Sequence, residues 1–103
     1  MEWRYFGTRE VRIARQWAGD GGVAVHENLF RLRGMRCAHL LAPDEERLVV
    51  AALLLGCQAR WIQRTSTLHF DLVGDFLTRA LLHCGVDPSH PPARTVWPRG
   101  PSP

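Results

Sequence analysis

Apolar and polar positions alternate along two stretches of the chain, and this period of two is typical of β-strands. In residues 35–41, every second residue falls on one side of the expected strand, namely Met35, Cys37, His39 and Leu41. In residues 67–72, the apolar side carries Leu68, Phe70 and Leu72, and the polar side carries His69 and Asp71. Shorter β-prone runs at 23–25 and 59–63 predict two further strands.

Two segments carry helix signals at both ends. Pro43 fits a first helical turn, and the acidic residues at 44–46 complement the positive end of the helix dipole. This helix continues through the apolar run 48–55 and is expected to stop at Gly56. A second helix is expected to have Asp75 as its N-cap and to end at Gly85.

The second half of the first of these helices is apolar on every side, so it must be covered on more than one face. We expect the sheet to cover one side and either the N-terminal segment or a second subunit to cover another. Residues 8–17 within that N-terminal segment fit a helix capped by Thr8, although residues 11–13 also alternate as an edge strand does. We favour the helix.

The order of elements from residue 23 onward is β, β, α, β, β, α, which predicts an α/β fold. We expect a small mixed sheet of about four strands with two main helices packed on it. Glycines at 19, 21 and 22 separate an N-terminal Arg/aromatic segment, residues 1–22, from the α/β core domain, residues 23–87. Residues 88–103 hold six of the chain's seven prolines and predict an extended, proline-rich tail anchored by Trp97.

Composition narrows the class of protein. A chain of 103 residues that is 46% hydrophobic is typical of one small globular domain. Its longest apolar run, 48–55, is too short to span a bilayer, and the N-terminus has no apolar signal region, so we expect no membrane partner. Three cysteines without paired spacing indicate a reducing compartment and a cytoplasmic protein.

The basic charge is carried by 13 arginines with no lysine, for a net charge of +3. Most of the excess lies near the two ends of the chain, where aromatic residues accompany it. Arginine binds phosphates and carboxylates in a bidentate manner and stacks on aromatic rings. This distribution predicts a contact surface for a protein partner or a second copy, with Trp3, Arg4 and Trp97 as candidate partner-binding residues. Nucleic acid is a possible partner on the same grounds.

The candidate chemistry lies in the two alternating strands. If they are adjacent, His39, His69 and Asp71 converge on one face, where two imidazoles and a carboxylate can bind a divalent metal with a position open for water. The same residues can act without metal, as a histidine base oriented by a carboxylate. A purely structural alternative is that each histidine donates to a backbone carbonyl and Asp71 caps a turn.

Two neighbouring features add weaker candidates. His26, Glu27 and Asn28 follow the first expected strand and can supply a further ligand or only a polar turn. Cys37 can act as a nucleophile with a histidine base, although a thiol among apolar neighbours is usually a small core residue.

Several short motifs occur in a consistent order: Val-Ala-Val-His-Glu at 23–27, Cys-Ala-His-Leu at 37–40, Trp-Ile-Gln at 61–63 and His-Phe-Asp at 69–71. In this the chain resembles a family of short uncharacterised bacterial and phage proteins, a domain of unknown function. The family has no established activity, so the resemblance implies only that His39, His69 and Asp71 belong together. The chain departs from the family pattern at His26, in place of an acid, and at Phe70, in place of tyrosine.

The leading hypothesis from the sequence is a small cytoplasmic accessory or partner-binding protein with a polar His/His/Asp pocket. The alternative is a metal-assisted hydrolase that acts on a phosphorylated or nucleic-acid substrate. In that alternative His39 and His69 are metal ligands and Asp71 is a ligand or base. Arg79 would stabilise developing negative charge.

Overall fold

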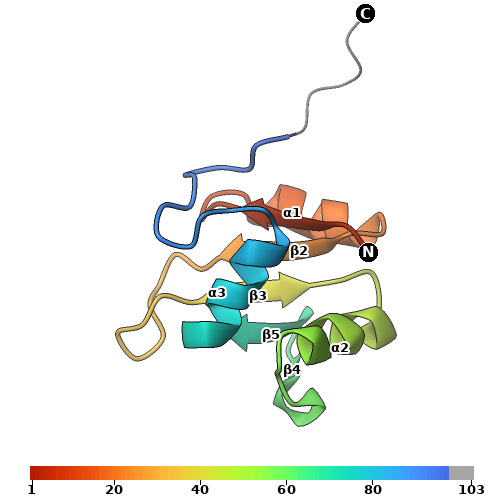
Figure 1. The fold of residues 1–103 in the computed structure, drawn as a ribbon. Coiled ribbons are helices and arrows are strands. Elements are labelled where there is room, and N and C mark those ends of the chain that lie inside the picture. The colour runs from red at the N-terminus through yellow and green to blue at the C-terminus, as the bar shows by residue number, and fades with distance from the viewer. Residues whose placement is uncertain (98–103) are drawn as a thin grey trace, which may run out of the picture.

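The computed structural model describes residues 1–97, which form one mixed sheet with helices on both faces (Figure 1). The elements in chain order are β1 (Trp3–Phe6), α1 (Val11–Gly19), β2 (Val23–Glu27), β3 (Ala38–Leu41), α2 (Glu45–Leu54), a 3₁₀ turn η1 (Ala59–Trp61), β4 (Gln63–Arg64), β5 (Leu68–Leu72) and α3 (Gly74–His83). The sheet has five strands in the order β1-β2-β3-β5-β4. Only β1 and β2 run parallel, and the other neighbours are antiparallel.

The main core lies between the sheet and the helix pair α2 and α3. Alternate strand residues such as Val25, Leu40 and Phe70 are buried there against Leu48 of α2 and Leu81 of α3. Burial of these apolar side chains is the main source of the fold's stability. The predicted α/β class with a small mixed sheet and packed helices is confirmed, with five strands in place of about four.

The opposite face of the sheet is only partly covered. α1 packs its two buried alanines, Ala14 and Ala18, against Phe6, Ala24 and Leu41 in a second, smaller core. The helix therefore lies over β1, β2 and the near side of β3 (Figure 1). Polar side chains of β3 and β5 on this face remain partly open to solvent, since α1 does not extend across them.

The helix predicted over the N-terminal segment is present as α1, but the segment isn't separate from the core. Residues 3–6 form β1, which pairs in parallel register with β2 from Trp3 opposite Val23 to Phe6 opposite His26. The sequence of β1 does not alternate between apolar and polar residues, because both of its faces are buried. Tyr5 lies in the main core and Phe6 in the smaller one. Gly22 therefore lies in the connection between α1 and β2 and does not mark the edge of the sheet domain.

The acidic start and the glycine end predicted for this helix are confirmed in α2, whereas Pro43, predicted in the first turn, precedes the N-cap residue Asp44. Asp44 caps its N-terminus by accepting a hydrogen bond from the Arg47 amide at 2.8 Å, and the chain leaves the helix through Gly56, whose φ is 88°. The outer side of its apolar half stays exposed at Val50, Leu53 and Leu54. The N-terminal segment does not cover this side, because α1 lies on the other face of the sheet.

Other predicted boundaries differ from the structure. The strand predicted at 59–63 is instead the 3₁₀ turn η1 followed by the two-residue β4. The strand predicted at 35–41 begins only at Ala38, because Met35 pairs with Leu32 in a tight turn at Arg33 and Gly34, both with positive φ. Helix α3 starts at Gly74 without a side-chain cap, and Asp75, predicted as its N-cap, lies in the first turn.

Residues 88–97 form no helix or strand and run back along the domain. The Thr95 amide donates to the Glu10 carboxylate at 2.6 Å, and the Trp97 ring packs edge-on against Phe6 with centroids 5.8 Å apart. Trp97 thus anchors this part of the predicted tail, and the rest, 98–103, lies outside the described residues. Within residues 1–97, no helix has the length and apolar character required to cross a membrane.

Candidate metal centre

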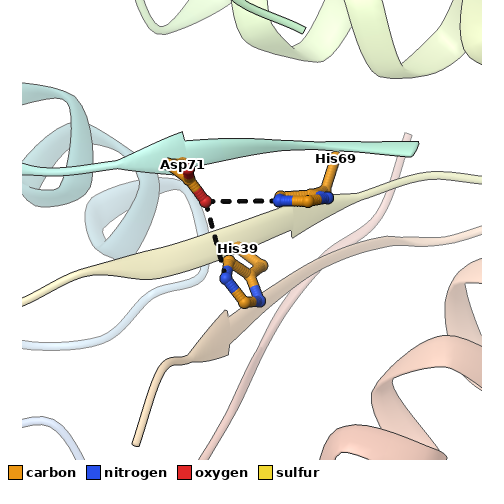
Figure 2. A group of neighbouring side chains, drawn as sticks. All are labelled: His39, His69 and Asp71. Carbon is orange, nitrogen blue, oxygen red and sulfur yellow. Dashed lines mark ion pairs between the residues drawn. The ribbon is translucent and has the colours of Figure 1, made fainter. Parts of the chain in front are cut away.

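The candidate centre is built on the pairing of β3 with β5. These strands are antiparallel neighbours, and the register places His39 directly opposite Asp71. His69 precedes Asp71 by two residues on β5, so all three side chains project from the same face of the sheet. Figure 2 shows the three side chains directed toward one another. The adjacency of strands on which the predicted site depended is therefore present.

The three side chains present one carboxylate oxygen between two ring nitrogens. Asp71 Oδ1 lies 3.5 Å from His39 Nε2 and 3.3 Å from His69 Nε2. A ligand atom from each residue lies within 4.8 Å of the other two. Ligands bound at 2.0–2.1 Å in a tetrahedron lie about 3.3–3.4 Å apart, so the two measured separations fit the edges of a zinc-type coordination sphere.

A backbone contact fixes the orientation of His69. The Thr67 carbonyl accepts a hydrogen bond from His69 Nδ1 at 2.8 Å. In a neutral ring, a proton held on Nδ1 leaves the Nε2 lone pair available to a metal. Metal-ligating histidines commonly hold their other ring nitrogen in this way. The structural alternative, in which the histidine donates to a backbone carbonyl, is thus compatible with metal binding through the other nitrogen.

His39 is favoured in its neutral form. Burial lowers the pKa of His39, and the neighbouring imidazole of His69 adds to this effect, although Asp71 opposes it. A neutral imidazole is the form that binds metal, since a protonated ring has no free lone pair. The side chains of the group are 14–31% exposed, so water reaches them from solvent.

His26 is on β2, the neighbour of β3 away from β5, and it pairs with His39 in the β2–β3 register. The two ring centroids are 6.1 Å apart. Nε2 of His26 lies 3.3 Å from the Thr8 carbonyl oxygen, to which it donates, while the buried Nδ1 has no hydrogen-bond partner within residues 1–97. His26 is therefore next to the centre but outside the set of three ligand atoms. Glu27 points to the other face and pairs with Tyr5 and Arg36.

A cavity of about 170 Å³ lies beside the two histidines of the centre. Its lining residues come from α1, the middle strands and the turn before β5: Val11, Arg15, His26, His39, Leu41, Thr65, Ser66, Thr67 and His69. Arg15 and the hydroxyl-bearing turn 65–67 were not among the residues predicted from the sequence. The spacing of Arg15 and Val11 was a usable signal in the sequence. The two residues are four positions apart, which places both on the side of α1 that lines this cavity.

Two other predicted chemical residues are not suited to the roles predicted for them. Arg79 is on α3, on the opposite face of the sheet, and donates to the Leu55 carbonyl at 2.9 Å. It therefore cannot act on a substrate held at His39 and His69. Cys37 is buried, and burial raises the pKa of its thiol, so the neutral form is favoured and a nucleophilic thiolate is not.

The predicted partner-binding residues make contacts within the chain. Trp3 stacks on His83 of α3 at a centroid distance of 4.6 Å. Arg4 pairs with Glu2 and lies over the ring of Trp97. Trp97 keeps 47% of its surface exposed. These residues thus join the N-terminal strand to α3 and to the C-terminal segment.

No family model, no curated protein and no solved structure matches the chain. The resemblance to uncharacterised bacterial and phage proteins therefore stays a prediction.

Proposed function

We propose that the protein binds one divalent transition-metal ion through His39 Nε2, His69 Nε2 and Asp71 Oδ1. The observation that carries this proposal is the spacing of the three ligand atoms, together with the Thr67 carbonyl that holds His69 in the required tautomer. A set of two imidazoles and one carboxylate suits zinc and its first-row neighbours better than calcium or magnesium, which prefer oxygen ligands.

Three protein ligands leave a coordination position for water, which is the arrangement of catalytic rather than structural zinc sites. A metal in such a site lowers the pKa of its bound water to about 7 and so supplies hydroxide at neutral pH. The reaction class that we propose is therefore metal-assisted hydrolysis. Asp71 contributes the one negative charge of the ligand set, and the neutral imidazoles leave the loaded centre with a net positive charge that attracts anionic substrates.

The proposal is tested by elemental analysis of the untagged protein after equilibration with zinc and removal of excess metal. We expect close to one zinc per chain in the wild type and little in His39→Ala. His90→Ala is the matched control, because His90 lies on the exposed C-terminal segment and, within residues 1–97, its side chain pairs only with Asp87. The absence of stoichiometric zinc in the wild type, or equal zinc in His39→Ala, would refute the metal centre.

A separate observation favours a second candidate function, self-association. Val50, Leu53 and Leu54 project from α2 with 45–58% of their surface exposed, and no other element within residues 1–97 covers them. This patch carries no charge, so its complement is another apolar surface, and a second copy of the chain presents an identical one. We propose that α2 pairs two copies of the protein. The predicted partner-binding role is then carried by α2 rather than by Trp3 and Arg4.

Sedimentation equilibrium over a range of protein concentrations tests this pairing. We expect a dimer in the wild type and a monomer in Leu54→Glu, because a buried unpaired carboxylate opposes association. Leu29→Glu is the control, since Leu29 is equally exposed but lies in the turn between β2 and β3. A wild-type monomer at every concentration would exclude the pairing and would leave the metal centre unaffected.

A further inference from the structure

The cavity beside the metal centre differs in charge from the centre itself. Among its lining residues are one arginine and no carboxylate. Arg15 forms no ion pair with any residue of 1–97, and its guanidinium is exposed on α1. Arg15 lines the same cavity as the rings of His26 and His39. The cavity is therefore a cationic compartment that adjoins the two metal-ligating histidines.

The other polar groups of the cavity can form hydrogen bonds with an oxyanion that also carries a hydroxyl group. Ser66 and Thr67, in the turn before β5, also line the cavity. His26 is only 5% exposed and its Nδ1, an acceptor when Nε2 donates to Thr8, has no partner within residues 1–97. A buried acceptor of this kind costs free energy unless a donor from water or a ligand reaches it.

The size of the cavity limits what can enter it. A volume of about 170 Å³ corresponds to roughly five or six water molecules at about 30 Å³ each. Pockets that enclose a whole drug-sized ligand hold about 300–1,000 Å³. The cavity thus accommodates one compact terminal group. A terminal phosphate fits such a compartment more closely than a phosphate within a nucleic-acid backbone, which has to continue on both sides.

We propose that Arg15 binds the terminal phosphate of a phosphate monoester in this cavity and directs it at the metal centre. This inference rests on the proposed metal-dependent function. Arginine offers two parallel N–H donors to a phosphate, which fixes both its position and its orientation. The protonated oxygen of a phosphate monoanion supplies the donor that His26 Nδ1 lacks.

The corresponding reaction balances with water alone. With a metal held by His39, His69 and Asp71, a water beside these ligands would supply the oxygen that bonds to phosphorus, while the bond between phosphorus and the ester oxygen would break. The departing alcohol takes up one proton, so that the products are the free alcohol and inorganic phosphate. Arg15 takes the role for which Arg79 was predicted, stabilisation of negative charge on the phosphoryl group.

Inorganic phosphate titrated into the cobalt-substituted protein tests the inference, because the visible spectrum of cobalt reports on ligands near the metal. We expect a saturable spectral change in the wild type and affinity at least about tenfold weaker in Arg15→Gln, the loss typical of one hydrogen-bonded charge pair. Arg15→Lys should recover part of this affinity. Arg12→Gln is the matched control, since Arg12 is exposed on the same helix but does not line the cavity.

The outcomes separate the two proposals. If Arg15→Gln binds cobalt and phosphate as the wild type does, the role of Arg15 is wrong and the metal centre stands. If the wild type forms no cobalt site, the metal centre fails and the phosphate site fails with it. Equal weakening in Arg12→Gln and Arg15→Gln would indicate a general charge effect and would overturn the specific role of Arg15.

Discussion

His39 of β3 lies directly across the sheet from Asp71 of β5, and His39 Nε2 is 3.5 Å from Asp71 Oδ1. The two residues are 32 positions apart in the sequence, and only the antiparallel pairing of their strands brings them together. A shift of one residue in that register would move one of them to the buried face. The apolar neighbours Leu40 and Phe70, which pair in the same register, hold it in place from the main core.

Asp71 supplies the charge of the metal centre, so Asp71→Asn should weaken metal binding while it preserves the shape of the site. Loss of a group that only orients a ligand reduces metal affinity about 10–100-fold, and loss of a ligand's charge should cost at least as much. Competition with a chromogenic zinc chelator measures this change. Asp75→Asn, in the first turn of α3, is the control and should bind zinc as the wild type does.

Gly7 decides how the C-terminal segment docks. A Cβ at this position would lie 1.8 Å from the Ala93 carbonyl oxygen, so Gly7→Ala must displace residues 93–95 from the domain. We expect faster proteolytic cleavage between residues 88 and 97 and a red-shifted tryptophan emission, as Trp97 loses its contact with Phe6. Gly19→Ala, whose added Cβ meets no atom within 4 Å, should leave both measurements unchanged.

Cys84 should lower the free energy of unfolding as the pH becomes alkaline. Burial raises the pKa of its thiol to about 12 in the folded protein, well above the roughly 8.5 of an unfolded thiol. The contribution of the protonated thiol to the free energy of unfolding is fully present below about pH 8.5. It is lost as the pH rises toward the pKa of the folded protein, by up to about 1.4 kcal/mol per pH unit. Urea denaturation between pH 8 and 10.5 should therefore show a shallower decline for Cys84→Ala than for the wild type.

The comparison of the wild type with Cys84→Ala isolates the effect of the Cys84 thiol on stability, because Tyr5 and the other thiols are the same in both proteins. Burial and the hydrogen bond to Glu27 also raise the pKa of Tyr5, so some alkaline decline remains in Cys84→Ala. Parallel curves for the wild type and Cys84→Ala would contradict the predicted shift.

Glu27 links β1 to the turn before β3. Its carboxylate accepts hydrogen bonds from Tyr5 Oη at 2.8 Å and from Arg36 Nε at 2.9 Å. Tyr5→Phe removes one neutral donor and should cost about 1 kcal/mol of unfolding free energy. Glu27→Ala leaves both partners without an acceptor and should cost about 2–3 kcal/mol, below the full value for a buried pair because Arg36 is partly exposed.

Thermal or urea unfolding of these two variants measures the difference. Arg64→Ala is a matched control, since its ion pair with Glu45 is on the surface and should contribute less than about 1 kcal/mol. A cost for Glu27→Ala no larger than that for Arg64→Ala would show that the buried network adds nothing to stability.

The elements with a strong local pattern could be predicted from the sequence. The helix from Asp44 to Gly56 carries its own cap, its own charges and its own terminator, so α2 forms where the pattern places it. The alternation around Phe70 likewise predicts β5 and the shared face of His69 and Asp71. In contrast, Ala59–Trp61 has the composition of a strand but forms a 3₁₀ turn, in which the ring of Trp61 packs on Phe76 of α3.

The α/β class and the shared face of His69 and Asp71 follow from local periodicity, so both can be predicted from the amino-acid sequence alone. The folded chain was needed to show that β1 joins the sheet, that Arg79 lies on the far face and that Arg15 adjoins the centre. These relationships join residues distant in the chain. They depend on strand order and on which face each helix covers, and no local pattern of side chains encodes either.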